Sequence, residues 1–494
     1  MSNNSNVKHA FAYKDLREWI READKLGEMK YINGLNWERE IGMVTEMLHH
    51  TDPAPCGLFD EIPGVKKGFR VLTNFFSAKR ANMTLGFPAG LSRLELSEEF
   101  LKVYRNPNNQ PIPHKIVETG PIFENILTGD KVDLGIFPTP KWHEEDGGRY
   151  LGTGSYNVTR DPDENWINCG TYRCMIQGKN TIGFYISPGK HGRIHRDKYA
   201  ERGEKMPALI VVGGNPMQFI LSSQEVPYGV CEYDILGGLY GKPLECVKGK
   251  ITGLPMPADA EIVLEGWIDP KEFKDEGPFG EWTGYYASDT RPEPVMHVEA
   301  IYHRNDPIIL GCPPQRPPDE LARYRAVARS ALLKQSIQAA GVPDITNVWA
   351  HEVGTARMLV AVSIKQRYPG HATQAGHVAC QCHVGAYAGR YVIVVDDDID
   401  PSNLEELMWA TVSRSDPATS IDIVKNAWST PLDPRITPEQ RATKDFTSSR
   451  AIINACRPFH WRDQFPKVNM PSKELAKETR QKFGHLIEGW GKSV

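Results

Sequence analysis

The chain has 494 residues, which exceeds the roughly 250–300 residues at which one hydrophobic core stops growing, so we expect two or three domains. A composition of 40% hydrophobic and 24% charged residues is typical of soluble globular proteins and excludes a disordered or collagen-like chain. The 58 Lys and Arg residues against 62 Asp and Glu residues leave a net charge of -4, which argues against binding to nucleic acid or an anionic membrane and favours a small-molecule substrate.

The N-terminal segment, residues 1–20, lacks the apolar core of a signal peptide, and no apolar stretch approaches the roughly 20 residues that span a bilayer. Nine cysteines, an odd number, are scattered along the chain, which is typical of reduced thiols in the cytosol. We therefore expect a soluble, unexported, cytoplasmic protein.

The first predicted elements form a mixed α/β pattern. Residues 13–26 repeat their apolar side chains at helical spacing, and Gly27 follows as a C-cap. Short apolar runs punctuated by Gly and Pro come next, such as residues 69–72, and residues 94–104 have a helical pattern. We expect a small N-terminal α/β lobe over residues 1–110.

The next segment is rich in strands. Short runs of β-branched and aromatic residues, bounded by turn residues, occupy positions 181–186, 208–212, 261–266 and 295–302. They predict a barrel or a two-sided sheet over residues 111–315.

A proline cluster between positions 313 and 318 ends this segment and precedes a strong helical pattern over residues 319–339. We expect a linker helix at 316–340, with the prolines as a hinge over a cleft. Arg323 and Arg325 lie on this helix; they suggest a polar or doubly acidic substrate, and the alternative is a solvated helix face.

The remaining chain predicts a second α/β domain at 341–460. Residues 358–364 and 391–395 are unbroken apolar runs, as in parallel strands covered on both faces. A charged amphipathic helix at 472–490 forms a tail, residues 461–494, which we expect to dock on a neighbouring subunit.

The run Cys380-Gln-Cys382-His383 contains three residues of the types that bind zinc, so a zinc site is one interpretation. However, no second Cys/His pair stands at the spacing of a zinc finger, and a buried strand with alternating side chains also explains the run. We favour the strand.

Two carboxylates flank a Gly-Pro-aromatic-Gly turn in the run Glu276-Gly-Pro-Phe-Gly-Glu281. A tight turn brings its ends together, and two neighbouring carboxylates in a dry pocket raise one pKa, so that one of them can deliver a proton near neutral pH. The alternative is a surface turn with solvated acids.

A second set of polar residues suits a metal ion. Asn168, His191 and Glu232 supply one imidazole and two oxygen ligands, which suits Mn2+ or Mg2+ better than Zn2+. Because these residues lie far apart in the sequence, spacing alone does not distinguish a metal site from coincidence.

These motifs occur in order with several others, and together they resemble the UbiD family, which includes polyprenyl-hydroxybenzoate and ferulic-acid decarboxylases. The resemblance covers nearly the whole chain. The further motifs are Glu261-Ile-Val-Leu-Glu-Gly266, Arg316-Pro-Pro-Asp-Glu320, Ile364-Lys-Gln-Arg-Tyr-Pro-Gly-His-Ala372, Asp396-Asp-Asp-Ile-Asp400 and Leu407-Met-Trp-Ala-Thr411.

The resemblance implies a multidomain α/β fold of the α+β type, in which a linker helix joins a flavin-binding split β-barrel domain to an α/β oligomerisation domain. It also implies a homodimer or homohexamer, and a flavin prenyltransferase that supplies prenylated FMN. The reaction would be the reversible decarboxylation of an aromatic or α,β-unsaturated acid through a covalent adduct with that cofactor, since an sp2 carbon that loses CO2 needs an electron sink that no side chain offers.

Site residues follow from the resemblance by position. Asn168, His191 and Glu232 would hold Mn2+ against the cofactor phosphate, with K+ as a further candidate ion. The residues that would line the flavin are Asn168, Cys169, Gly170, Thr171, Tyr172, Arg173 and Lys190. Arg173 would orient the substrate carboxylate, Glu276 would balance the charge of Arg173, and Glu281 would donate the proton.

One departure from the family concerns the phosphate. Ferulic-acid decarboxylases place a Lys near it, whereas the matching stretch here reads Cys382-His383-Val384-Gly385, so we expect His383 or Arg390 to replace the Lys. Three rival interpretations remain: a flavin-binding protein with other chemistry, a noncatalytic assembly subunit, and a metal-only lyase.

Overall fold

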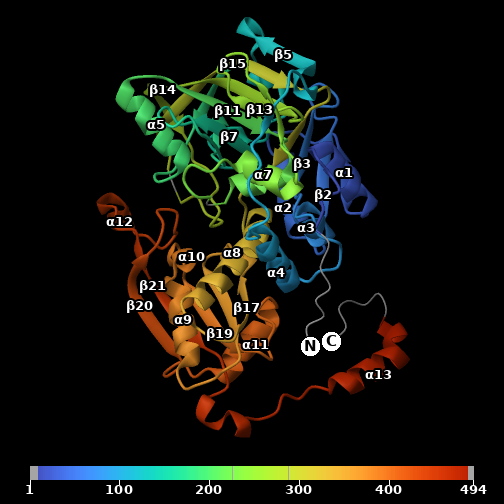
Figure 1. Cartoon of the computed structure of the whole chain (residues 1–494), viewed down its shortest axis with the longest axis vertical. Coiled ribbons are helices and arrows are strands. Elements are labelled where there is room, and N and C mark those ends of the chain that lie inside the picture. The colour runs from blue at the N-terminus through green and yellow to red at the C-terminus, as the bar shows by residue number, and fades with distance from the viewer. Residues whose placement is uncertain (1–8, 225, 288, 488–494) are drawn as a thin grey trace.

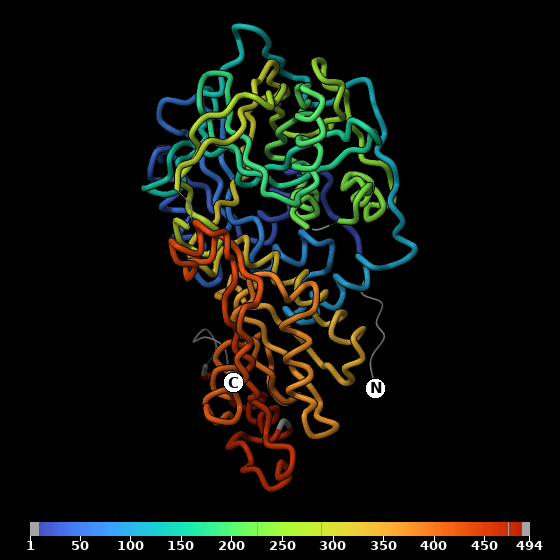
Figure 2. Tube along the Cα trace, turned by 90° about the vertical axis from the view of Figure 1, so that its left-hand side faces the viewer, coloured from blue at the N-terminus to red at the C-terminus, as the bar shows by residue number. Residues whose placement is uncertain are grey.

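The computed structural model describes residues 9–224, 226–287 and 289–487. An upper body holds most of the strands, a separate C-terminal domain lies below it, and the last described helix stands away from both on an extended segment (Figure 1). Figure 2 shows the same two bodies along one long axis, with the C-terminal domain narrower than the upper body. The chain thus has the mixed α/β fold with a separate C-terminal domain that the sequence predicts.

The N-terminal lobe is a small sheet with helices beside it. Its elements are α1 (Leu16–Lys25), β1 (Met29–Asn33), α2 (Glu40–His49), β2 (Cys56–Asp60), β3 (Arg70–Thr73), α3 (Ala78–Thr84), α4 (Arg93–Tyr104) and β16 (Ile308–Gly311). Asp15 caps α1 by accepting a hydrogen bond from the Glu18 N–H, and Trp19 is fully buried, so the predicted first helix is confirmed. β16 pairs in parallel with β3, which returns the chain from the next segment to this sheet.

The largest sheet has nine strands and curls into a half-barrel, in the strand order β6-β9-β10-β15-β14-β11-β7-β8 with β5 paired to β15. The strands are β5 (Asn125–Thr128), β6 (Tyr150–Gly152), β7 (Ser155–Arg160), β8 (Ile167–Gly170), β9 (Cys174–Ile176), β10 (Thr181–Phe184), β11 (Met206–Val212), β14 (Ile262–Glu276) and β15 (Arg291–His303). The helices of this segment are α5 (His191–Arg202), α6 (Pro216–Ser222) and α7 (Glu232–Tyr240), and a small sheet contains β4 (Lys115–Ile116), β12 (Glu245–Lys248) and β13 (Pro255–Pro257). All four predicted strands are confirmed.

The β14–β15 hairpin is longer than the sequence predicts. The predicted strand ends at Gly266, but β14 continues through Trp267 and Ile268 and then through mostly charged residues to Glu276, with irregular pairing between Ile268 and Phe273. Because β15 offers a continuous pairing partner, tertiary context overrides the low strand propensity of this second half. The extension carries Glu276 to the tip of the hairpin.

The C-terminal domain is a five-stranded sheet flanked by helices. Its elements are α8 (Glu320–Ala339), β17 (Ile345–Ala350), β18 (Leu359–Ile364), α9 (His371–Gln381), α10 (His383–Ala386), β19 (Tyr391–Asp396), α11 (Leu404–Arg414), β20 (Ile421–Trp428), α12 (Pro438–Thr443) and β21 (Thr447–Asn454). β18 and β19 are parallel and buried, as predicted. α8 packs against both α4 and β17, so it joins the two bodies through one continuous apolar core.

The tail contains α13 (Lys473–Phe483), and the short 3-10 helices among the described residues are η1 (Pro121–Glu124), η2 (Gly129–Lys131), η3 (Leu134–Ile136), η4 (Glu352–Gly354), η5 (Phe459–Gln464) and η6 (Gly484–Ile487). The predicted tail helix at 472–490 is thus present up to residue 487, and its last part lies outside the described residues. Among the described helices none is both long and apolar enough to cross a bilayer.

Two interpretations of the sequence are wrong. The Cys380 to His383 run is not a strand: it spans the end of α9 and the start of α10, because the preceding small residues favour a helix and the run has no β-branched residue. In addition, Arg323 is not on a solvated helix face, because its guanidinium donates to the backbone oxygen of His49 and to Asn74 Oδ1.

Candidate active site

One arginine binds both predicted acids. Arg173 donates from Nη1 to Glu281 Oε1 at 2.5 Å and from Nη2 to Glu276 Oε2 at 2.6 Å. Arg173 lies in the short segment between β8 and β9, whereas Glu276 ends β14 and Glu281 follows in the hairpin loop. The turn therefore brings its two carboxylates onto a single guanidinium.

This trio is almost entirely removed from solvent. Glu276 is 0% exposed and Glu281 is 8% exposed, and Glu276 Oε1 and Arg173 Nε are buried without a hydrogen-bond partner. Burial raises the pKa of Glu281 above its ordinary value, Arg173 opposes this shift, and Glu276 adds to it. Burial disfavours the charge on Arg173, but Glu281 and Glu276 outweigh it and raise the pKa of that guanidinium.

A neighbouring segment holds the hairpin loop in place. Asp146 Oδ1 accepts a hydrogen bond of 3.0 Å from the Gly280 N–H, and the Gly147 N–H donates to the Pro278 oxygen at 2.8 Å. A Cβ atom on Gly147 would stand 1.9 Å from the Gly277 oxygen, so only glycine permits this approach. We did not predict Asp146 from the sequence; the Gly147-Gly148 pair beside it is the signal of a close backbone approach.

Aromatic rings cover the guanidinium. The centroids of Tyr185 and Phe279 lie 4.9 Å and 5.2 Å from the Arg173 Cζ atom. The Tyr185 ring centroid also lies 4.3 Å from the Arg291 Cζ atom, and Arg291 Nε donates a hydrogen bond to Glu293 Oε1. The trio therefore has apolar walls and a second cation nearby, neither of which the sequence pattern revealed.

The predicted metal ligands come from three adjacent elements. Asn168 lies on β8, while His191 and Glu232 are the first residues of α5 and α7. Glu232 Oε2 accepts a hydrogen bond of 2.7 Å from the Cys169 N–H, which ties α7 to β8. The N-termini of both helices thus lie against the β8 segment, and such termini favour anions because their first N–H groups are unpaired.

Tyr172 links the strand to α5. Its hydroxyl oxygen accepts hydrogen bonds from Asn168 Nδ2 at 3.3 Å and from the Gly192 N–H at 3.0 Å. A Cβ atom on Gly170 or Gly192 would lie within 2.7 Å of the Tyr172 side chain, so both glycines make room for the ring. The segment from Asn168 to Arg173 therefore runs without a break from the predicted metal ligands to the arginine that binds Glu276 and Glu281.

The charge states of these ligands suit a cation. Burial lowers the pKa of His191, and Lys190 lowers it further, so the imidazole is neutral and can coordinate. Burial raises the pKa of Glu232 to about 8, and the Cys169 N–H opposes this shift. Among the described residues no cationic side chain makes a hydrogen bond or ion pair with this carboxylate. A divalent ion would supply that missing charge.

The two residues expected at the phosphate lie in the C-terminal domain. His383 is exposed at the start of α10, and Arg390 Nη2 donates to Asp433 Oδ2 at 2.5 Å. Asp433 is fully buried and also accepts from Ser429. Contact of His383 or Arg390 with a phosphate stays a prediction.

The C-terminal domain touches the loop that carries Glu281. Arg441, on α12, donates from Nη1 to the Ala287 oxygen at 2.9 Å. The Arg357 Cζ atom lies 5.7 Å from the ring centroid of Trp282, which is the residue after Glu281. The position of the C-terminal domain therefore bears directly on the position of Glu281.

Comparison with known families agrees with this geometry. The model of the 3-octaprenyl-4-hydroxybenzoate carboxy-lyase Rift-related domain matches residues 115–317, and the model of the carboxy-lyase C-terminal domain matches residues 324–455. The chain belongs to the UbiD family. As a member of this family it is a carboxy-lyase, and the resemblance inferred from the sequence motifs is confirmed.

Two curated relatives of this UbiD protein are named as decarboxylases. A pyrrole-2-carboxylic acid decarboxylase of Pseudomonas aeruginosa is 30% identical, over 90% of this chain and 91% of its own length. A phenolic acid decarboxylase of Bacillus subtilis is 33% identical, over 86% of this chain and 90% of its own.

Solved structures share the fold over nearly the whole chain. The UbiD-class enzyme HmfF of Pelotomaculum thermopropionicum, in complex with FMN, matches with a TM-score of 0.82 and 27% identity, over 93% of this chain and 98% of its own. The vanillic acid decarboxylase of Sedimentibacter hydroxybenzoicus is 28% identical. Its open form matches with a TM-score of 0.83, over 96% of this chain and 99% of its own. Its closed form matches with a TM-score of 0.76, over 97% of this chain and 100% of its own. The arrangement of the two bodies here is thus nearer to that open form.

Proposed function

We propose that this UbiD protein catalyses the non-oxidative, reversible decarboxylation of an aromatic or α,β-unsaturated carboxylic acid with prenylated FMN. The observation that carries this proposal is the buried Arg173 guanidinium bound to both Glu276 and Glu281. A buried cation between two buried acids suits a reaction in which a carboxylate must be held and a carbon must then be protonated.

The residues present fit the cofactor and its metal. Asn168, His191 and Glu232 offer a mixed oxygen and nitrogen donor set suited to Mn2+, and the N-termini of α5 and α7 suit a phosphate. Between these residues and Arg173, the stretch Cys169 to Tyr172 is the segment that we assign to the flavin ring system. Lys190 is a further residue that we assign to the flavin, His383 or Arg390 is assigned to its phosphate, and K+ is a further candidate ion.

The cofactor, when bound, supplies the electron sink that the departure of CO2 from an sp2 carbon requires. The chain supplies the rest. Arg173 binds the substrate carboxylate, and Glu276 keeps the guanidinium in place. The substrate carboxylate adds a negative charge beside Glu281 and raises its pKa again, so Glu281 can carry the proton that replaces CO2. The rings of Phe279 and Tyr185 exclude water from this transfer.

We infer an aromatic acid as the substrate class, because the names of the relatives specify pyrrole-2-carboxylic, phenolic and vanillic acids. The decisive experiment incubates these acids in D2O with protein co-expressed with a flavin prenyltransferase. We expect CO2 release, with one deuterium at the carbon that lost the carboxylate. An unchanged acid, or a product with an oxidised ring, would contradict the proposal.

The raised pKa of Glu281 predicts a specific pH dependence. A proton donor is active while protonated, so activity is full below its pKa and is lost as the pH rises through that pKa. Because burial raises the pKa, this loss should begin at a higher pH than for an ordinary glutamate and reach about tenfold per pH unit. The measurement is kcat/KM for CO2 release against pH; a rate that climbs with pH over the same range would assign Glu281 to proton removal instead.

The contact between Arg441 and the Ala287 oxygen predicts a positioning effect. Replacing Arg441 by Ala should lower kcat about tenfold, because the loop that holds Glu281 loses a hydrogen bond to the C-terminal domain. The same substitution should leave the amount of bound flavin nearly unchanged. Arg435→Ala, an exposed arginine of the same segment, is the control. Equal kcat values for the two variants would show that this contact does not position the loop.

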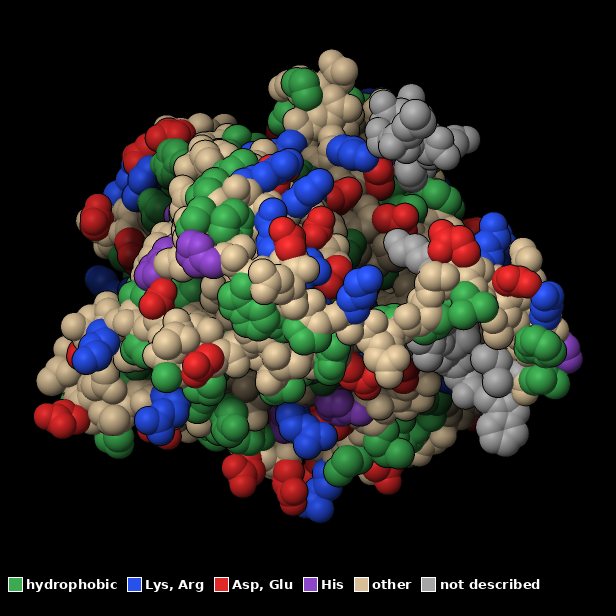
Figure 3. Space-filling view, turned by 90° about the horizontal axis from the view of Figure 1, so that it is seen from below, with side chains coloured by type: hydrophobic (Ala, Val, Ile, Leu, Met, Phe, Trp, Pro, Cys, Tyr) green, Lys and Arg blue, Asp and Glu red, His purple; other side chains and the backbone are tan. Residues whose placement is uncertain are grey.

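We further propose a cytoplasmic homodimer or homohexamer supplied with cofactor by a flavin prenyltransferase. Seen from below, hydrophobic side chains lie open among charged ones (Figure 3). Trp409 and Val412 on α11 and Leu475 on α13 are among the exposed hydrophobic residues, and a second copy of the chain would cover them. Sedimentation of the full chain distinguishes monomer, dimer and hexamer, and a monomer would exclude the assembly.

A further inference from the structure

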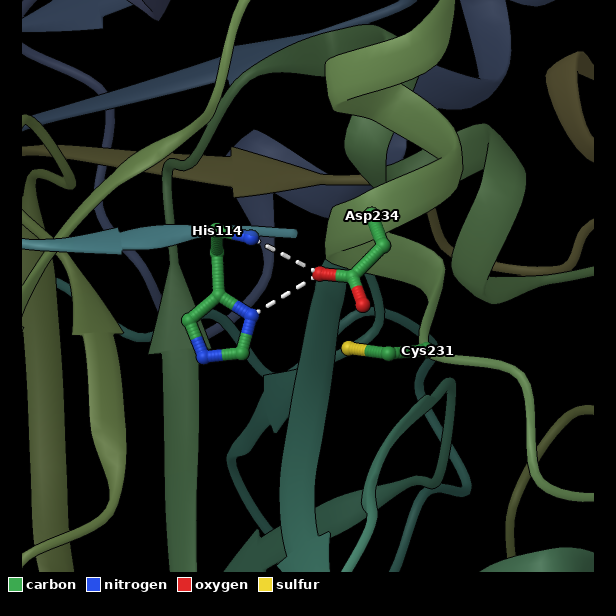
Figure 4. Close-up of side chains that lie close together, drawn as sticks. All are labelled: His114, Cys231 and Asp234. Atoms are coloured by element: carbon green, nitrogen blue, oxygen red, sulfur yellow. Dashed lines mark hydrogen bonds and ion pairs between the residues drawn. The ribbon is translucent and has the colours of Figure 1, made fainter. Parts of the chain in front are cut away.

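A second group of metal-binding side chains lies outside the catalytic trio. His114, Cys231 and Asp234 each offer a donor atom, and these atoms all lie within 4.8 Å of one another. Figure 4 shows the three side chains pointing toward one another, with the Cys231 sulfur beneath the carboxylate and facing the imidazole. In the part of the chain that the structure describes, no other such group of three His, Cys, Asp or Glu side chains occurs, and the Cys380 to His383 run does not form one.

The backbone holds this group in place. Cys231 is the N-cap of α7 and Asp234 lies in the first turn of that helix, so the helix fixes their spacing. His114 comes from the segment just before β4, and both its backbone N–H and its Nδ1 lie 2.9 Å from Asp234 Oδ1. The Ile112 N–H also donates to the backbone oxygen of Asp234, at 2.9 Å. Two segments far apart in sequence are therefore already joined around the donors.

The donor types and spacing suit one kind of ion. In a tetrahedral zinc site, bond lengths of about 2.0–2.3 Å place neighbouring donor atoms roughly 3.3–3.8 Å apart, which small shifts of these three side chains would reach. Imidazole, thiolate and carboxylate together suit Zn2+ or Co2+, whereas Mn2+ prefers oxygen ligands.

We propose that His114, Cys231 and Asp234 form a second divalent-metal site, for Zn2+ or a similar borderline-soft ion. This site is distinct from the one assigned to Asn168, His191 and Glu232, because its donor set contains a thiolate. The two sites share the first turn of α7, since Glu232 stands between Cys231 and Asp234. An ion at this site would tie that turn to the His114 segment and so fix the backbone that carries Glu232.

Cobalt provides a test that does not depend on catalysis or on the flavin. The full-length protein is dialysed against a chelator and titrated with Co2+ alone, and its absorption spectrum is recorded. We expect a sulfur-to-cobalt charge-transfer band that saturates at one Co2+ per chain. Ions bound by Asn168, His191 and Glu232 give no such band, because that donor set has no sulfur.

Variants then identify the ligands. Cys231→Ser should abolish the band, His114→Ala should weaken Co2+ binding by about 100-fold while keeping the band, and Cys456→Ser, a buried thiol of the C-terminal domain, should match the parent. His114 is only partly buried, so its variant remains informative if Cys231→Ser fails to fold. No band in the parent protein, a band that persists in Cys231→Ser, or His114→Ala binding equal to the parent would overturn the proposal.

Discussion

Glu281→Gln should release CO2 about 10²- to 10⁴-fold more slowly than the parent protein while binding as much cofactor. The amide keeps the shape of the side chain and can still accept a hydrogen bond from Arg173, but it carries no acidic proton. The loss corresponds to about 3–5 kcal/mol of transition-state stabilisation. CO2 release at saturating substrate, beside the absorption spectrum of the bound flavin, measures both quantities.

A matched control separates proton donation from damage to the hairpin. Glu299→Gln changes an exposed glutamate on β15 and should behave as the parent protein. If Glu281→Gln retained parental activity with a full complement of cofactor, the proton would have to come from another group, and the assigned role of Glu281 would be wrong.

The second large effect concerns Glu232. Glu232→Gln removes the only charged ligand of the three assigned to Mn2+, and we expect Mn2+ binding to weaken by about 100-fold or more, since even the loss of residues that support a ligand costs about 10- to 100-fold. Bound flavin should fall with the metal, because the metal would neutralise the cofactor phosphate. Metal content and flavin absorbance of the purified protein measure the two losses.

Glu204→Gln, at an exposed position after α5, is the control for this variant. Parental Mn2+ and flavin contents in Glu232→Gln would contradict the metal assignment. Loss of Mn2+ with full retention of flavin would show that flavin binding does not depend on the metal. The N-termini of α5 and α7 would then bind the phosphate without the ion.

Elements with strong local patterns could be predicted from the sequence. α1 and α8 have helical spacing and capping aspartates, and β18 and β19 are continuous apolar runs. In each case the local preference and the tertiary environment agree. The Glu276 to Glu281 turn could also be predicted from the sequence, because its glycine and proline favour a chain reversal that brings the two acids together.

Features that depend on distant partners could not be predicted. The second half of β14 is charged and forms a strand only because β15 pairs with it, and the role of Arg323 depends on a backbone oxygen at His49. The contacts of Asp146 and Arg441 with the hairpin loop could not be predicted for the same reason, because each joins residues more than a hundred positions apart in the sequence. The pairing of Arg173 with both acids came from the family resemblance and not from spacing.

The central claim is that this chain releases CO2 from an aromatic acid and needs prenylated FMN to do so. The most direct test measures labelled CO2 from carboxyl-labelled aromatic acids, with protein made in one host with and without a flavin prenyltransferase. We predict release only by the protein from the host that has the prenyltransferase. Equal release by both preparations, or none from the panel by protein whose bound prenylated flavin and Mn2+ have been verified, would contradict the claim.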